Sequence, residues 1–206
     1  MGEQSKNYGK KINIRLSNRH IHLSEEDERL LFGEAGISVK RYTAWEGGGP
    51  FAANETVTLR GPKGEIRGVR VMGPSRSVTQ AEILTADQYA LGIEAPVRMS
   101  VGLQGGAELT IEGPCGTIVR PCAIVAHRHI HLGPDLAEAW GLPDGGSCCV
   151  RTGGVRALIF ENVLIKYGKK PGEANMHIDT EEGNAAGIRN NSPGEIVSVT
   201  LERGAP

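Results

Sequence analysis

The chain has 206 residues, of which 39% are hydrophobic and 23% are charged, so wholesale disorder is excluded and two domains of about 100 residues can form. Its formal net charge of −1 excludes a general electrostatic attraction to nucleic acid or to an anionic membrane. No apolar run approaches the ~20 residues of a membrane span, and the first ten residues lack the apolar segment of a secretory signal.

The composition favours short strands. Glycine is abundant, at 29 residues, and aromatic residues make up only 4%. Glycine at this level without a collagen period indicates many turns, and frequent Val, Ile and Thr alternation is typical of strands in small barrels. The four cysteines have no C-x-x-C spacing, and we expect them to be reduced thiols. A mainly β, cytoplasmic protein is therefore expected.

An internal repeat organises the chain. SNRHIHLSEED at 17–27 recurs as AHRHIHLGPD at 126–135. Two weaker relatives, TQAEILTADQYALGI at 79–93 and NMHIDTEEGNAAGI at 175–188, follow the same plan. In each segment a β-like stretch contains a potential metal ligand, and acidic residues and a short helical run follow it.

The residues after each potential ligand suit the starts and ends of short helices. Ser24, Thr85 and Thr180 are typical N-cap residues, and Pro134 suits a first helical turn. The expected C-cap glycines are Gly92, Gly141 and Gly187. We therefore expect a short helix directly after each ligand-bearing strand.

Strand-rich stretches lie between these motifs. Residues 55–74 alternate apolar and polar side chains about a Gly-Pro-Lys-Gly turn, and residues 107–126 do so about Gly-Pro-Cys-Gly. Alternation around a Pro/Gly turn predicts a β-hairpin. We expect two small β-barrel domains with short capping helices, related by the internal repeat. The expected division is a flexible N-terminus at 1–11, a first barrel at 12–95 and a second at 96–206.

Five of the six histidines fall in the repeated motifs. Residues i and i+2 of a strand point to the same face, so His-x-His presents two imidazoles together. Neutral imidazole suits zinc and other borderline divalent metals. A single His-x-His could be a chance of alternating polar positions, but two in equivalent places indicate metal binding. The histidine candidates are His20, His22, His129, His131 and His177.

Glu82 is the carboxylate candidate. It occupies in the third motif the place that His177 occupies in the fourth, three residues before a Thr, so we expect it to be a ligand. The alternative is a solvated glutamate on a strand. His127 also alternates with the histidines of 129–131, but Asn18 stands at its counterpart in the first motif. We expect a supporting or surface role for His127.

Arginines are dense near the motifs, and Arg76 ends the strand that leads toward Glu82. A guanidinium beside a metal can clamp phosphate with two hydrogen bonds, whereas the alternative for each arginine singly is an ordinary surface residue. Other catalytic schemes have less support. Cys148 and Cys149 could supply a nucleophile, but no His partner lies nearby in sequence. The chain has no G-x-S-x-G for an acyl-serine route, and no Walker A or G-x-G-x-x-G nucleotide fingerprint.

These segments together resemble the PduL-type phosphate propanoyltransferase (phosphotransacylase) family. The matching stretches, which span residues 17–188 in the order of the family, are SNRHIHLS, PFAANETVTLRGPKG, VRVMGPSR, TQAEI, LGIEAPVR, AHRHIHL and MHIDTEEGNAAG. The resemblance implies two β-barrels with short capping helices, usually a homodimer, and a dinuclear zinc site. It also implies interconversion of a short-chain acyl-CoA (propionyl-CoA or acetyl-CoA) plus phosphate with acyl phosphate plus CoA.

The resemblance also assigns roles to residues. The zinc that meets the CoA sulfur would be held by His20, His22 and Glu82. The second zinc would be held by His129, His131 and His177. Arg76 would bind phosphate, with direct transfer and no acyl-enzyme. The residues at the CoA contacts of the family are Ser17, Arg70, Met72 and Asn184, with Met72 where Leu is common.

Two other functions stay open. The first is a cupin-like metal-dependent oxygenase or isomerase that uses His20, His22 and Glu26, although Glu26 is expected to lie in a helix. The second is a non-catalytic, metal-stabilised structural protein. Some family members have an amphipathic N-terminal extension for packaging into bacterial microcompartments, whereas only about ten polar residues precede the first expected strand here. The cytoplasm is expected, and the microcompartment lumen is the alternative.

Overall fold

The structure is a computed structural model that describes residues 9–43, 49–100 and 105–200. The chain divides into two compact units. The first, here the terminal unit, combines Met1–Ser17 with His127–Pro206, and the second, the central unit, is Asn18–Ala126. Among the helices of the described residues, none is both long and apolar enough to cross a membrane.

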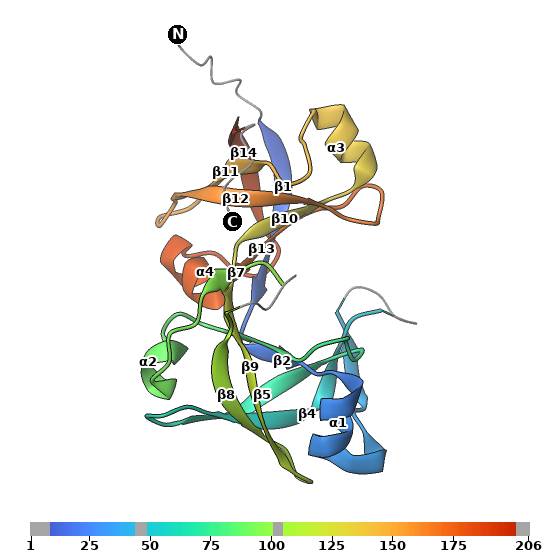
Figure 1. Cartoon of the computed structure of the whole chain (residues 1–206). Coiled ribbons are helices and arrows are strands. Elements are labelled where there is room, and N and C mark those ends of the chain that lie inside the picture. Colours follow the sequence, from blue (N-terminus) through green and yellow to red (C-terminus); the bar gives the residue numbers. More distant parts are fainter. Residues whose placement is uncertain (1–8, 44–48, 101–104, 201–206) are drawn as a thin grey trace. The chain divides into compact units, whose positions relative to one another are not determined.

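The terminal unit is a closed barrel of six strands in the order β1-β13-β10-β12-β11-β14 (Figure 1). Its strands are β1 (Lys10–Ser17), β10 (His129–Leu132), β11 (Ser147–Thr152), β12 (Ile159–Tyr167), β13 (Ala174–Asp179) and β14 (Ser192–Thr200). Two short helices, α3 (Pro134–Trp140) and α4 (Thr180–Ala186), follow β10 and β13. Apolar side chains that alternate along these strands fill the barrel, among them the buried Ile14, Ile130, Val150, Met176 and Ile196.

The central unit contains a second ring of six strands, β4-β5-β2-β6-β9-β8, which closes because β8 pairs with β4. Its strands are β2 (His20–His22), β3 (Val39–Tyr42), β4 (Phe51–Arg60), β5 (Glu65–Gly73), β6 (Gln80–Ile83), β7 (Val97–Arg98), β8 (Ala107–Glu112) and β9 (Thr117–Ala126). The helices are α1 (Glu25–Phe32), the 3-10 turn η1 (Gly33–Ala35) and α2 (Asp87–Leu91). The mainly β fold with two barrels and short helices is confirmed.

The two barrels have the same topology, as the internal repeat predicts. The order β1-β13-β10-β12-β11-β14 corresponds to β9-β6-β2-β5-β4-β8, and parallel and antiparallel pairs follow in the same order around both rings. In each repeat, however, the first strand (β1 or β9) joins the barrel of the other repeat.

This exchange of strands makes the predicted domain boundaries wrong. The predicted barrels at 12–95 and 96–206 assume that each barrel is continuous in sequence, whereas β1 pairs with β13 and β14 near the other end of the chain. Of the predicted flexible stretch 1–11, residues 1–8 lie outside the described residues, and β1 already begins at Lys10.

The predicted helix signals are confirmed in part. The Ser24 side chain accepts a hydrogen bond from the Asp27 backbone at the start of α1, and Pro134 begins α3. The three predicted C-cap glycines, Gly92, Gly141 and Gly187, all adopt the left-handed conformation. Thr85 and Thr180 are not N-caps, because Ala86 and Asp179 hold these positions. The Asp179 carboxylate forms a capping box in which it accepts from the backbone of the third helical residue, a stronger cap than a Thr hydroxyl provides.

Both predicted hairpins of the central unit form, and each turn packs on the C-terminal end of a helix. In the Gly-Pro-Lys-Gly turn the Lys63 N–H donates to the Leu91 carbonyl of α2 at 3.0 Å. In the Gly-Pro-Cys-Gly turn the Cys115 N–H donates to the Leu31 carbonyl of α1, also at 3.0 Å. The turns therefore satisfy helix carbonyls that have no partner within the helix.

Replacing Gly61 with Ala is expected to lower the free energy of unfolding by about 2 kcal/mol. A Cβ atom at Gly61 would lie 2.2 Å from the Leu91 carbonyl oxygen, so the turn would have to move off the helix end. Thermal and urea unfolding measure the loss. The matched control is Gly153→Ala, where the added Cβ meets nothing within 4 Å, and equal stability of the two variants would contradict the close packing of this turn.

Candidate metal centre

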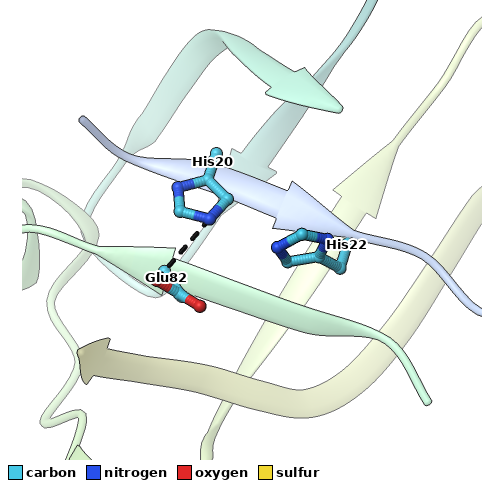
Figure 2. Close-up of side chains that lie close together, drawn as sticks. All are labelled: His20, His22 and Glu82. Atoms are coloured by element: carbon cyan, nitrogen blue, oxygen red, sulfur yellow. Dashed lines mark ion pairs between the residues drawn. The ribbon is translucent and has the colours of Figure 1, made fainter. Parts of the chain in front are cut away.

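His20, His22 and Glu82 come together on two antiparallel strands of the central unit (Figure 2). His20 lies directly opposite Glu82 in the β2–β6 register, and the His20 Nε2 to Glu82 Oε2 distance is 3.5 Å. The ligand atoms of the three side chains all lie within 4.8 Å of one another. The structure thus places the predicted carboxylate beside the His-x-His pair.

Backbone carbonyls orient both imidazoles of this triad. His20 Nδ1 lies 2.8 Å from the Asn18 carbonyl oxygen, and His22 Nδ1 lies 3.1 Å from the Met72 carbonyl oxygen. A carbonyl oxygen only accepts, so each Nδ1 must be the protonated nitrogen. The Nε2 lone pairs are then available to a metal, which is the arrangement that histidine ligands usually show.

Two side chains hold the Glu82 carboxylate. Gln80 Nε2 donates to Glu82 Oε1 at 2.7 Å, and the Ser100 hydroxyl donates to the same oxygen at 2.8 Å. Burial opposes ionisation of Glu82, but the attraction of His20 and the Ser100 hydrogen bond outweigh it, so the pKa of Glu82 is lowered. Glu82 is thus an anionic candidate ligand, and its second oxygen faces His20. Neither Gln80 nor Ser100 was predicted, because neither belongs to a recognisable spacing.

His22 is held neutral. Burial, the neighbouring His20 and the Arg76 charge together lower the pKa of His22 from its ordinary 6.5 to about 3. His22 is 6% exposed, so water cannot screen a charge there effectively. A neutral imidazole at physiological pH is the form that binds a metal.

This depressed pKa makes the metal-free protein sensitive to acid. The unfolded chain takes up a proton at His22 near pH 6.5, whereas the folded chain does so only near pH 3. The contribution of His22 to the free energy of unfolding is therefore full above pH 6.5 and is lost as the pH falls toward 3. Uptake of one proton on unfolding lowers the free energy of unfolding by about 1.4 kcal/mol for each pH unit of acidification. Urea unfolding of chelated protein between pH 7 and 4 measures this slope. His22→Gln is expected to reduce the slope by about one proton, whereas His127→Gln, which removes an imidazole outside the triads, should retain it.

In the terminal unit His129, His131 and His177 occupy the equivalent positions of the barrel, with their imidazole rings close together. His129 lies opposite His177 in the β10–β13 register, as His20 lies opposite Glu82. The ring centroids are separated by 4.8 Å (His129 to His131), 5.0 Å (His131 to His177) and 5.3 Å (His129 to His177). Burial and the nearby Lys166 lower the pKa of His131, so this imidazole also favours its neutral form.

The first histidine of each triad, His20 or His129, is oriented by the same kind of backbone contact in both units. His129 Nδ1 lies 2.8 Å from the His127 carbonyl oxygen, two residues earlier, as His20 Nδ1 lies 2.8 Å from that of Asn18. His127 therefore supports the triad with its backbone, while its own Nδ1 lies 2.9 Å from the Arg128 carbonyl oxygen. These contacts of His127 agree with the supporting role that the sequence predicts for it.

The spacing of these atoms fits zinc. Two ligand atoms bonded at ~2.0–2.1 Å to one tetrahedral zinc lie about 3.3 Å apart. The His129 Nε2 to His131 Nε2 distance is 3.2 Å, and the His20 Nε2 to Glu82 Oε2 distance is 3.5 Å. Three protein ligands around a zinc would leave a coordination position open, as in catalytic zinc sites.

Arg76 lies beside the central triad. Its backbone N–H donates to the Leu23 carbonyl at 2.8 Å, one residue after His22. Its charge acts on the pKa values of both His22 and Glu82, which places the guanidinium close to the ligands. Arg76 is exposed at the surface, although partial burial of its guanidinium lowers its pKa. The exposed part of the side chain is accessible to an anion in solution.

The four predicted CoA contacts lie in both units. Ser17 ends β1 opposite Asp179, and Asn184 is exposed on α4. Arg70 lies opposite His20 on β5, and its Nη1 donates to the carbonyls of β4 residues 53 and 54 at 3.0 and 2.7 Å. Met72 is partly buried on the same strand. Arg70 thus has a structural contact that its resemblance-based role did not predict.

The alternatives based on Cys148 and Glu26 gain no support from the structure. Burial raises the pKa of Cys148 to about 12, and the same cause raises that of Cys122 to about 12, so both are protonated thiols and poor nucleophiles at neutral pH. Glu26 lies in α1 and is exposed, whereas Glu82 is the carboxylate that joins His20 and His22. The cupin-like ligand pattern is therefore not formed.

Comparison with known proteins agrees with these observations. A family model described as phosphate propanoyltransferase matches residues 13–189. The phosphate propanoyltransferase of Rhodobacter capsulatus is 46% identical over 182 residues, which cover 88% of this chain and 84% of the relative. Those of Thermotoga maritima (44% identical; 91% and 88% covered) and Salmonella typhimurium (44% identical; 87% and 85% covered) are also similar. The chain therefore belongs to the phosphate propanoyltransferase family of acyltransferase enzymes.

Proposed function

We propose that this chain is a phosphate acyltransferase that converts a short-chain acyl-CoA, propionyl-CoA or acetyl-CoA, plus phosphate to acyl phosphate plus CoA, reversibly, with a dinuclear zinc site. One observation supports this most: the ligand atoms of His20, His22 and Glu82 in the central unit all lie within 4.8 Å of one another. His129, His131 and His177 occupy the equivalent positions in the terminal unit, where the Nε2 atoms of His129 and His131 are 3.2 Å apart. The family to which the chain belongs supplies the reaction class.

One zinc would be held by His20, His22 and Glu82, and the other by His129, His131 and His177. Zinc bound at these triads supplies Lewis-acid stabilisation of the departing thiolate and of the developing oxyanion. The chain itself supplies the orientation of the ligands. The carbonyls of Asn18 and Met72 fix the tautomers of the central imidazoles, and Gln80 and Ser100 hold the carboxylate.

Arg76 would bind the phosphate. Its planar guanidinium can donate two parallel hydrogen bonds to phosphate oxygens beside the central triad. A phosphate oxygen then bonds to the thioester carbonyl carbon, the carbon–sulfur bond breaks, and CoA leaves as a thiolate. Direct transfer needs no nucleophilic side chain, which is consistent with the high pKa values of Cys122 and Cys148. Holding phosphate in place supplies the proximity that the step requires.

Several further assignments rest on the family resemblance. Ser17, Arg70, Met72 and Asn184 are proposed CoA contacts. A homodimer in the cytoplasm is proposed, with the microcompartment lumen as the alternative location. The structural-protein alternative has less support, because three ligands per metal leave coordination incomplete and a structural zinc site is usually closed by four.

The function is tested by release of the CoA thiol from propionyl-CoA and acetyl-CoA, with and without phosphate. We expect release that requires phosphate, that stops when a chelator removes the metal, and that returns when zinc is added back. Release that proceeds equally without phosphate would indicate a hydrolase. Iron in the purified protein together with oxygen uptake would favour the oxygenase alternative.

A further inference from the structure

Each triad is flanked by an ion pair between an arginine and a carboxylate. In the central unit Arg19 Nε lies 2.8 Å from Asp87 Oδ2, and in the terminal unit Arg128 Nη1 lies 3.1 Å from Glu182 Oε1. In both units the arginine directly precedes the first histidine of the triad, and the carboxylate follows the third ligand by five residues. The ion pairs therefore repeat together with the ligands.

Each carboxylate also accepts a backbone hydrogen bond close to the third ligand. Asp87 Oδ2 accepts from the Leu84 N–H at 2.9 Å, and Glu182 Oε2 accepts from the Asp179 N–H at 3.3 Å. Leu84 and Asp179 both stand two residues after the third ligand of their triad. In each unit one carboxylate thus connects the backbone just after the third ligand to the arginine that precedes the first histidine of the triad.

Each of these two ion pairs, here called bridges, has a further feature that stabilises it. Asp87 is 4% exposed, and a buried carboxylate is strongly destabilising without its partner. The Arg128 guanidinium also lies 5.7 Å from the ring centroid of the buried Phe160, a cation–π contact. The arrangement is retained in both units although the third ligand changes from Glu82 to His177, so it is linked to the position of the ligand and not to its chemistry.

We propose that Asp87 with Arg19, and Glu182 with Arg128, are positioning residues for the metal ligands. Each bridge ties two ligand-bearing strands together where they end, so that the third ligand faces the histidine pair before a metal binds. This proposal rests on the proposed zinc sites. Breaking one bridge would leave all three ligands present but less well ordered, and changes of this kind beside a metal site commonly weaken metal affinity 10–100-fold.

The test uses variants in which one zinc site remains. In a His177→Ala background, Asp87→Asn is expected to weaken zinc binding at the central triad 10–100-fold. In a Glu82→Gln background, Glu182→Gln should do the same at the terminal triad. The amide oxygen of either variant can still accept the backbone hydrogen bond, so each change removes mainly the negative charge that pairs with the arginine. Zinc affinity of the chelated protein is measured by competition with a fluorescent zinc indicator.

Exchanging the backgrounds provides the control. Asp87→Asn should leave the terminal site unchanged in Glu82→Gln protein, and Arg60→Gln, which breaks an exposed ion pair with Glu112 in the central barrel, should leave the central site unchanged. Arg19→Gln should reproduce the effect of Asp87→Asn, and the double variant should be no weaker than either single one.

The outcomes separate this inference from the proposed function. If Asp87→Asn lowers the unfolding temperature of the metal-free protein but leaves zinc affinity unchanged, the ion pair is merely structural and the inference is overturned. If the unaltered chain itself binds no zinc, the proposed metal centre is wrong, whatever the variants do. Weakened binding confined to the triad beside the broken bridge supports the inference.

Discussion

Replacing Glu82 with Gln is expected to lower phosphate-dependent CoA release about a thousandfold, which corresponds to about 4 kcal/mol of transition-state stabilisation. The amide keeps the size of the side chain and can still accept from Gln80 and Ser100. It removes the one anionic ligand of the central triad, and with it the charge that attracts His20. The zinc at that triad should be lost as well.

The Glu82 experiment compares kcat and zinc content of the purified variant with those of Glu108→Gln. Glu108 is an exposed glutamate on β8 of the same barrel, so its replacement controls for a lost surface charge. The Glu108 variant should retain full activity and zinc. A Glu82→Gln enzyme that retains both zinc ions and at least a tenth of the activity would exclude Glu82 as a ligand.

Replacing Arg76 with Ala is expected to lower kcat/KM for phosphate about 100-fold while zinc content stays unchanged. Loss of one charged partner from a hydrogen-bonded ion pair typically costs about 2–5 kcal/mol, and about 3 kcal/mol corresponds to this factor. The effect should appear mainly in the KM for phosphate if Arg76 binds the ground state. Arg76→Lys should recover only part of the loss, because an ammonium cannot donate as a planar fork.

Initial rates at varied phosphate and varied acyl-CoA separate the two substrates. Arg67→Ala is the matched control, since Arg67 is an exposed arginine on β5 that pairs with Glu65 at 2.5 Å. If the KM for acyl-CoA rose while that for phosphate did not change, Arg76 would be a CoA contact and not the phosphate ligand.

The juxtaposition of the candidate ligands is predictable because it follows from local rules. A strand places residues i and i+2 on one face, so His20 and His22 had to project together once β2 formed. The internal repeat then predicts that Glu82 occupies the position equivalent to that of His177. The registers of β2 with β6 and of β10 with β13 confirm that the two positions are equivalent. Local spacing and self-similarity were sufficient here.

The assembly of the barrels was not predictable in the same way. Strand alternation indicates which residues face a core but not which distant strand a segment pairs with. The sequence therefore groups β1 with the strands that follow it, whereas β1 pairs with β13 and β14. The supporting groups were missed for a similar reason. Ser100 reaches Glu82 from 18 residues away, and Asp87 reaches Arg19 from 68, and neither separation is a recognisable motif.

The central claim is that each barrel binds one zinc, and native mass spectrometry of the intact chain tests it most directly. The unaltered protein should contain two zinc ions. Glu82→Gln should contain one, His177→Ala should contain one, and the double variant should contain none. A single zinc in the unaltered protein, or two in either single variant, would contradict the claim.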